Sequence, residues 1–207
     1  MSTEPTDLSG LLAIAAALGW ASGLRLYAVV FLTGLAGNLG WVELPAGLHV
    51  LQSPVVLGVS GLMCAIEFFA DKIPGVDSLW DVIHTLIRVP AGAALAAAVF
   101  GSGQSDWAIA SALMGGTLAA TSHVAKATTR AALNVSPEPF SNISMSLLGD
   151  AVVPTSLWLS WQHPQAFFGA LLVALVLMVT TTWLLAKNLR RLAVRVTNWF
   201  GAGRLSR

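Results

Sequence analysis

Polar residues that could do chemistry recur in this chain at helical spacing. A mainly acidic set consists of Glu67, Asp71, Asp77, Asp81, His84 and Arg88, and a mainly basic set of His123, Lys126, Arg130 and Asn134. A third set is Asn142, Ser146 and Asp150, and Arg25 stands alone upstream. Most neighbours within a set are three or four residues apart, the spacing that places side chains on one face of a helix. The sequence therefore predicts polar helix faces that meet one another.

Two interpretations of these faces stay open. In the first, the acidic faces pair with the basic face as an internal ion-pair network that holds the helices in register and binds no ligand. In the second, the faces line a polar cavity that is open to the cytoplasm and binds an ion or a small solute. The carboxylates would then bind a cation or a proton, while Arg25, Lys126 and Arg130 would bind an anion. His84 and His123 would carry a proton near neutral pH.

A third hypothesis concerns a metal site. Asp77 and Asp81 are four residues apart and His84 follows three residues later, so that one helix face could hold a divalent cation such as Mg²⁺ against a phosphate. Lys126 and Arg130 would then bind that phosphate. The protein would be a metal-dependent membrane enzyme acting on a lipid phosphate. The chain has no glycine-rich phosphate loop or nucleophile motif beside these residues.

The composition explains why these charges stand out. Of 207 residues, 56% are hydrophobic and only 10% charged, and the mean hydropathy is +0.74, whereas about a quarter of the residues of an average soluble domain are charged. The net charge of +1 offers no field for nucleic acid, which excludes a nucleic-acid-binding protein. The single cysteine, Cys64, excludes an internal disulfide and a CxxC motif. The composition indicates a polytopic protein of the lipid bilayer.

The apolar runs predict an all-α transmembrane bundle of about six helices. The expected spans are residues 22–39, 55–70, 78–100, 107–133, 143–161 and 165–186. Residues 1–21 are expected to form a polar tail and an interfacial lead-in, 22–186 a single membrane domain, and 187–207 a basic tail. The hairpins 55–100 and 107–161 are each broken by prolines at their turns. Because its helices carry many Gly and Ala residues, the bundle is also a candidate for homo-oligomerisation.

The distribution of Lys and Arg predicts the orientation, since these residues in short loops stay cytoplasmic. The segment after residue 186 contains Lys187, Arg190, Arg191, Arg195, Arg204 and Arg207. The loops around Trp41, Gly103 and His163 contain neither Lys nor Arg. We therefore expect both termini and both proline breaks on the cytoplasmic side. The first ten residues contain acids and no Lys or Arg, opposite to a secretory signal peptide, so no cleaved leader is expected.

Three runs resemble a known family. They are residues 23–27 (GLRLY), residues 67–81 (EFFADKIPGVDSLWD) with His84 and Arg88, and residues 136–142 (SPEPFSN). They are similar to the bacterial membrane family catalogued as domain of unknown function 4126, over about residues 22–174. The resemblance implies a small integral membrane protein without an established activity. The positions that match its polar motifs are Arg25, Glu67, Asp71, Lys72, Asp77, Asp81, His84, Arg88, Glu138, Ser141, Asn142 and Asp150.

Together these observations favour a multi-pass protein of a bacterial inner membrane that transports or conducts a small solute or an ion through a charged site in the cytoplasmic half. The alternatives are the metal-dependent enzyme and a scaffold without catalytic activity.

Overall fold

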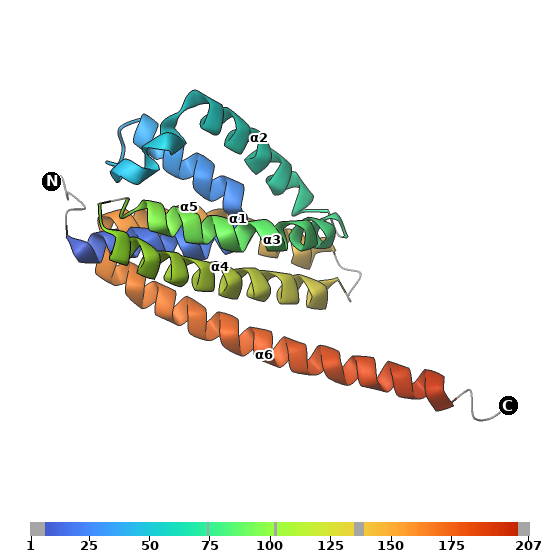
Figure 1. The fold of residues 1–207 in the computed structure, drawn as a ribbon. Helices are drawn as coiled ribbons and strands as arrows, with labels where there is room; N and C mark the ends of the chain where they lie inside the picture. The colour runs from blue at the N-terminus through green and yellow to red at the C-terminus, as the bar shows by residue number, and fades with distance from the viewer. Residues whose placement is uncertain (1–6, 74, 102, 135–138, 203–207) are drawn as a thin grey trace.

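A computed structural model describes residues 7–73, 75–101, 103–134 and 139–202 (Figure 1). In chain order the helices are α1 (Leu8–Asn38), the 3₁₀-helix η1 (Ala46–Gln52), α2 (Pro54–Ala70), α3 (Val76–Ala98), α4 (Ser105–Leu133), α5 (Pro139–Gln162) and α6 (Pro164–Ala202). The described residues contain no strand. The predicted all-α bundle is confirmed, with six long helices.

Four helices are each long and apolar enough to span a membrane, namely α1, α3, α4 and the Pro164–Asn188 part of α6. η1 and α2 meet at a bend of 70° and pass the same criteria only as a pair. α5 is long enough but carries five serines, an asparagine and an aspartate, which lower its apolar character. Length and composition therefore support four to five spans, against the six that the apolar runs predict.

α3 and α4 are antiparallel and define the two ends of the bundle. Asp81, near the start of α3, pairs with Arg130 near the end of α4, while Ala96 lies against Gly115 further back along α4. We call the end where α2 finishes and α3 begins the cluster end, and the opposite end the far end. α6 starts at the far end and runs past the cluster end, unbroken through the basic segment predicted as a tail (Figure 1).

α1 is two helical arms that meet at Arg25, whose backbone is not helical (φ −149°, ψ 85°). The arm 8–24 runs parallel to α4, because Gly19 lies against Gly115 and Leu24 contacts Lys126. The arm 26–38 returns antiparallel to α2, with Gly34 against η1 and α2. Both outer ends of α1 therefore lie at the far end, and its break lies in the cluster half (Figure 1).

The arm 8–24 corrects two sequence predictions. Residues 8–18 are not an interfacial lead-in: six consecutive residues of this arm, 13–18, are no more than 1% exposed, and they form the centre of the core. Their small side chains, four of them alanine, let neighbouring helices pack closely on all sides. Because this arm crosses the bundle, the start of α1 and the end of α6 lie at opposite ends, whereas the sequence reading placed both termini on one side.

Glycines make the central crossing possible. A Cβ on Gly19 would overlap the backbone of Gly115, and one on Gly115 would overlap α3 near Gly92. A Cβ on Gly23 would overlap the carbonyl oxygen of Ala119. Helix backbones touch directly at these points, an arrangement that membrane proteins use in place of a hydrophobic driving force between helices.

We expect Gly23→Ala to destabilise the protein, because the added Cβ meets backbone that cannot move aside. Overpacking of this kind costs about 1–3 kcal/mol, and each kcal/mol lowers the melting temperature of a chain of this size by about 2–4 °C. Thermal unfolding of the purified protein measures the change. The matched control is Gly58→Ala on α2, where a Cβ has no neighbour within 4 Å. Equal melting temperatures for the two variants would contradict the close crossing.

The two-armed α1 also predicts that Asp7 and Lys187, which are both exposed, lie on opposite sides of the membrane. In a Cys64→Ser background, a membrane-impermeant maleimide should label Asp7→Cys and Lys187→Cys from different sides. Labelling of both from the same side would show that α1 does not turn back at Arg25. The unsubstituted Cys64→Ser protein is the control for background labelling.

Candidate functional site

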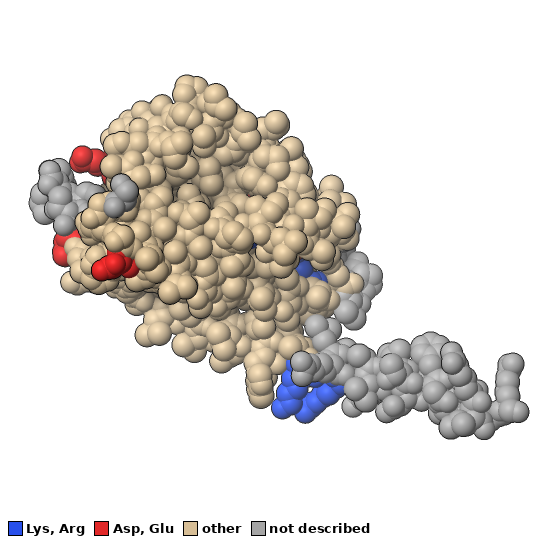
Figure 2. Space-filling model, viewed as in Figure 1, with Lys and Arg blue, Asp and Glu red and all other residues tan. Residues whose placement is uncertain are grey.

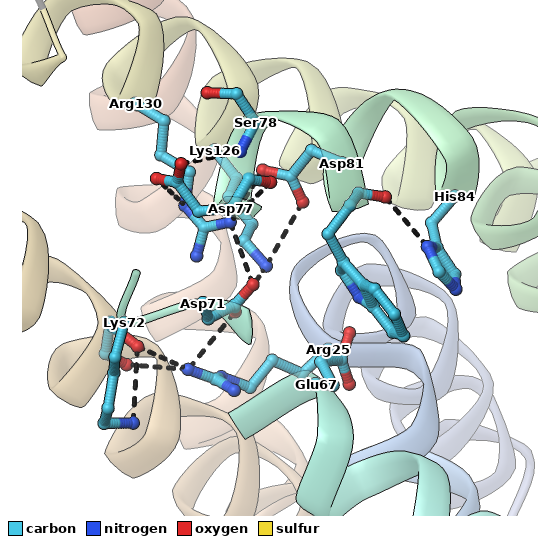
Figure 3. Close-up of polar contacts among 12 residues, drawn as sticks. Arg25, Glu67, Asp71, Lys72, Asp77, Ser78, Asp81, His84, Lys126 and Arg130 are labelled. Carbon is cyan, nitrogen blue, oxygen red and sulfur yellow. Dashed lines mark hydrogen bonds and ion pairs between the residues drawn. The ribbon is translucent and has the colours of Figure 1, made fainter. Parts of the chain in front are cut away.

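Ten charged side chains form one connected group at the cluster end. We call it the charge cluster; it comprises Glu67, Asp71, Asp77, Asp81 and Asp150 with Arg25, Lys72, Arg88, Lys126 and Arg130. All ten ion pairs between described residues belong to it. Five acids face five bases, so that the formal charges cancel. Figure 3 shows most of these side chains converging from several helices.

Asp71 is the centre of the charge cluster. It follows the last residue of α2 and is fully buried. Its carboxylate lies 2.8 Å from Lys126 Nζ, 2.9 Å from Arg130 Nη1 and 3.3 Å from Arg25 Nη2. Three cations so close to one carboxylate favour its charged form. Asp71 therefore joins α2 to α1 and α4.

Asp81 and Arg88 form a second group of ion pairs within the charge cluster. Asp81 lies 2.7 Å from Arg88 Nη1 and 2.8 Å from Arg130 Nη1. Arg88 has no exposed surface and also binds Glu67 Oε1 at 2.9 Å through Nη2. One guanidinium thus ties two turns of α3 to α2. The acidic faces of α2 and α3 do meet the basic face of α4.

Asp150 brings α5 into the charge cluster. It forms an ion pair with Arg25 Nη2 at 2.9 Å and accepts a hydrogen bond from Lys72 Nζ at 2.9 Å. One turn earlier, the Ser146 hydroxyl accepts from Arg25 Nη2 at 2.8 Å. Arg25 therefore reaches from the break of α1 to both α2 and α5. The helical spacing of polar residues does not pick out Lys72. Its contact with Asp150 makes it part of the charge cluster, and it lies in the run 67–81 that resembles the family.

Asp77 has a local structural role. Its Oδ1 accepts from the backbone nitrogens of Gly75 at 2.9 Å and Ser78 at 2.6 Å, so it binds amide groups at the start of α3. Arg130 Nε lies 3.9 Å from its other oxygen. Asn134 donates to the Ser78 hydroxyl at 2.9 Å and connects the end of α4 to the same turn.

The two histidines lie on different helices, His84 on α3 and His123 on α4, and each contacts a different set of side chains. His84 Nδ1 donates to the Trp80 carbonyl at 2.8 Å, and its Nε2 lies 3.1 Å from the Tyr27 hydroxyl. His123 Nδ1 lies 3.2 Å from Arg88 Nη1. Because a guanidinium can only donate, His123 Nδ1 carries no proton and the ring is neutral, with Nε2 donating to Thr85. Both rings therefore make side-chain contacts inside the bundle, and a proton-carrying role for them stays a prediction.

The break in α1 is supported by α4. A broken helix leaves carbonyl groups that water cannot reach inside a membrane bundle. Ser122 Oγ donates to the Trp20 carbonyl at 2.6 Å, and Lys126 Nζ donates to the Leu24 carbonyl at 2.8 Å. Lys126 therefore serves the broken backbone and the carboxylates of the charge cluster at once.

The structure gives no geometric support to the metal hypothesis. Asp77 binds backbone amides, Asp81 binds arginines and His84 binds Tyr27, so the three side chains do not converge on one point. Among the described residues, no group of three potential metal ligands exists. The DxxxD spacing instead serves two neighbouring parts of the ion-pair network.

Two further predicted site residues need separate mention. Glu138 lies outside the described residues. Asn142 is 2% exposed, and neither polar atom of its amide has a hydrogen-bond partner in the described part of the chain. It lies one turn before Ser146 on the same face of α5, directed like Ser146 toward the interior of the bundle.

A cavity of about 430 Å³ adjoins the charge cluster between α1, α4, α5 and α6. Arg25, Asp71, Lys126 and Arg130 contribute its charged wall. The rest of the lining is mainly apolar, with leucine, methionine and valine side chains of α5 and α6, and it also includes the hydroxyl-bearing Thr129, Ser146 and Thr181. The volume falls in the range of about 300–1,000 Å³ that is usual for small-molecule sites.

The fold and site define an integral membrane protein: an apolar helical bundle with several membrane-spanning helices and a buried, charge-balanced site. The chain matches the model of a family described as a domain of unknown function, DUF4126, over residues 12–186, and it belongs to that family. The resemblance stated from the sequence motifs is thereby confirmed, over a longer region. No curated protein and no solved structure matches the chain.

We expect Arg88→Gln to be strongly destabilising, because it leaves the buried Glu67 carboxylate without its cation. Breaking a buried ion pair on one side costs about 3–5 kcal/mol. The double variant Glu67→Gln/Arg88→Gln should recover much of this loss, since Asp81 keeps Arg130 and Lys126. Thermal unfolding of the single and double variants tests the coupling, with Lys187→Gln on the exposed part of α6 as control. Additive losses would contradict the pairing.

Proposed function

We propose that this protein transports a small solute or an ion across a bacterial inner membrane, and that the charge cluster with its adjoining cavity is the binding site. The observation that carries the proposal is the break of α1 at Arg25 inside the charge cluster. Membrane transporters place broken helices at their binding sites, since irregular backbone is tolerated at membrane depth only inside protein or beside a cavity.

The energetics of the charge cluster support a role beyond holding the helices together. Each ionisable residue inside a span costs about 3 kcal/mol on insertion scales. A buried ion pair often stabilises a protein no more than well-packed apolar side chains of similar volume would. Ten charges in one site are therefore an expensive way to build a bundle. A transport site needs such charges, because a charged solute can bind there by replacing one partner of an existing ion pair.

The contacts also suggest how the site changes. Arg25 connects the tip of α1 to Asp71 and Asp150, and each of these acids has a second cation available, Lys126 or Lys72. A solute that attracts Arg25 can thus release the tip of α1 without leaving a carboxylate unpaired. Movement of the two arms would then expose the site toward either side.

The orientation follows from the charge distribution. The exposed acids Asp7, Glu43 and Asp106 lie next to the outer ends of α1 and the start of α4, at the far end, whereas the exposed Lys187 follows Leu185, which lines the cavity at the cluster end. Figure 2 shows acidic side chains at one end of the molecule and basic side chains toward the other. Since Lys and Arg stay on the cytoplasmic side, we place the cluster end in the cytoplasm and the far end outside. In this orientation the end of α2, the start of α3 and the end of α4 face the cytoplasm, and the start of α1 faces outward.

Purified protein in sealed liposomes tests the proposal. Flux of protons, potassium, chloride, phosphate, acetate and dodecanoate is measured with the intact chain, with Arg25→Gln and with Lys187→Gln as control. We expect flux of at least one probe with the intact chain and the control, and its loss with Arg25→Gln. Arg25→Gln should still fold, because Asp71 and Asp150 keep Lys126, Arg130 and Lys72.

Two outcomes would overturn the transport function. Absence of flux for the whole panel, with the protein folded, would favour the structural ion-pair network and a scaffold role. Equal flux with Arg25→Gln would show that the path does not pass the charge cluster. Circular dichroism and the melting temperature of each variant establish that it is folded.

A further inference from the structure

We infer that the cavity beside the charge cluster binds an amphipathic anion, a carboxylate or phosphate head carrying a single hydrocarbon tail. The inference rests on the proposed function and names the substrate class of that site. It is argued from three observations: the charges on the cavity wall, the unused hydrogen-bond donors of two buried arginines, and the apolar nature of the remaining wall.

The charged wall favours an anion. Although the whole charge cluster is neutral, three cations and one carboxylate line the cavity itself, namely Arg25, Lys126, Arg130 and Asp71. The other acids of the charge cluster lie behind them and are not part of the wall. A cation placed in the cavity would meet three positive groups at close range, whereas an anion would gain from them.

Arg25 and Arg130 each have guanidinium nitrogens that take no part in the hydrogen bonds between described residues. Hydrogen bonds between described residues use only Nη2 of Arg25 and only Nη1 of Arg130. Both residues are at least 95% buried, and both side chains line the cavity. A fixed guanidinium fork is well suited to a carboxylate or phosphate.

The rest of the wall favours a hydrocarbon tail. Leu148 and Val152 from α5 face Leu177, Met178 and Leu185 from α6 across the cavity. A small hydrophilic anion would leave these side chains against water or empty space, whereas a tail fills the volume and removes apolar surface from water. α6 is only slightly buried over its membrane span, so a single layer of helix separates this chamber from the lipid.

Binding of radiolabelled dodecanoate to the full-length protein in phosphatidylcholine nanodiscs tests the inference. Dodecanol supplies the same tail without the charge, and acetate and inorganic phosphate supply the head without the tail. We expect dodecanoate to bind about tenfold or more tightly than dodecanol, the contribution of a hydrogen-bonded ion pair, and acetate and phosphate to compete only weakly. Equal affinity for dodecanol, or equal competition by acetate or phosphate, would overturn the inference.

Variants place the bound anion. Met178→Trp fills the cavity without touching the charge cluster and should abolish binding, while Leu172→Trp, on the lipid-facing side of the same helix, should not. Arg25→Gln should weaken binding of dodecanoate about tenfold and leave binding of dodecanol unchanged. Unchanged dodecanoate binding in folded Met178→Trp would overturn the assignment to this cavity.

Two further measurements separate the source of the bound anion from the transport function. Displacement of dodecanoate by lysophosphatidic acid in the nanodisc would identify a single-tailed membrane lipid as the occupant, and failure to displace it a free single-tailed carboxylate; both carry an anionic head on one hydrocarbon tail. Binding without flux in liposomes would overturn transport and leave the binding site standing. Flux of another probe without dodecanoate binding would do the reverse.

Discussion

The structure depends on the cancellation of ten charges in a place where water cannot screen them. No single helix carries a balanced set: α2 and its turn contribute mainly acids, α3 contributes acids and one arginine, and α4 contributes cations. Each element would be costly to insert with its charges unpaired. The charges cancel only in the assembled bundle. The ion pairs therefore determine which helices are neighbours and their axial register.

The break of α1 is the point where this electrostatic requirement and the backbone meet. Arg25 leaves the helical conformation and points its guanidinium between two carboxylates, while Lys126 binds both a carboxylate and the freed carbonyl of Leu24. The glycines at the crossing bring the backbones of α1, α3 and α4 close enough for side chains of α4 to reach that carbonyl. Small residues and charged residues therefore serve one arrangement, and neither would position the site without the other.

Much of the site could be predicted from the sequence because charges are rare in it. The spacing of Asp77, Asp81 and Arg88 shows their common face directly, and the opposing basic face of α4 is equally plain. The boundary expected after residue 21 lies close to the break at Arg25, but the return of the chain could not be predicted, since no proline marks it and the groups that satisfy its backbone lie 102 residues away in the sequence. Local patterns do not contain such long-range contacts. The same limit explains why the sequence alone places residues 8–18 at the membrane surface.

The burial of the arm 8–24 has a consequence for how the protein is made. This arm leaves the ribosome before α3 and α4, yet its closest backbone contacts are with those two helices. Lipid is a poor substitute for these partners, because the glycines of the arm fit directly against a neighbouring backbone and the arm ends beside an arginine. The arm therefore reaches its final position only after α4 has been made, and insertion into the bilayer has to keep it accessible until then.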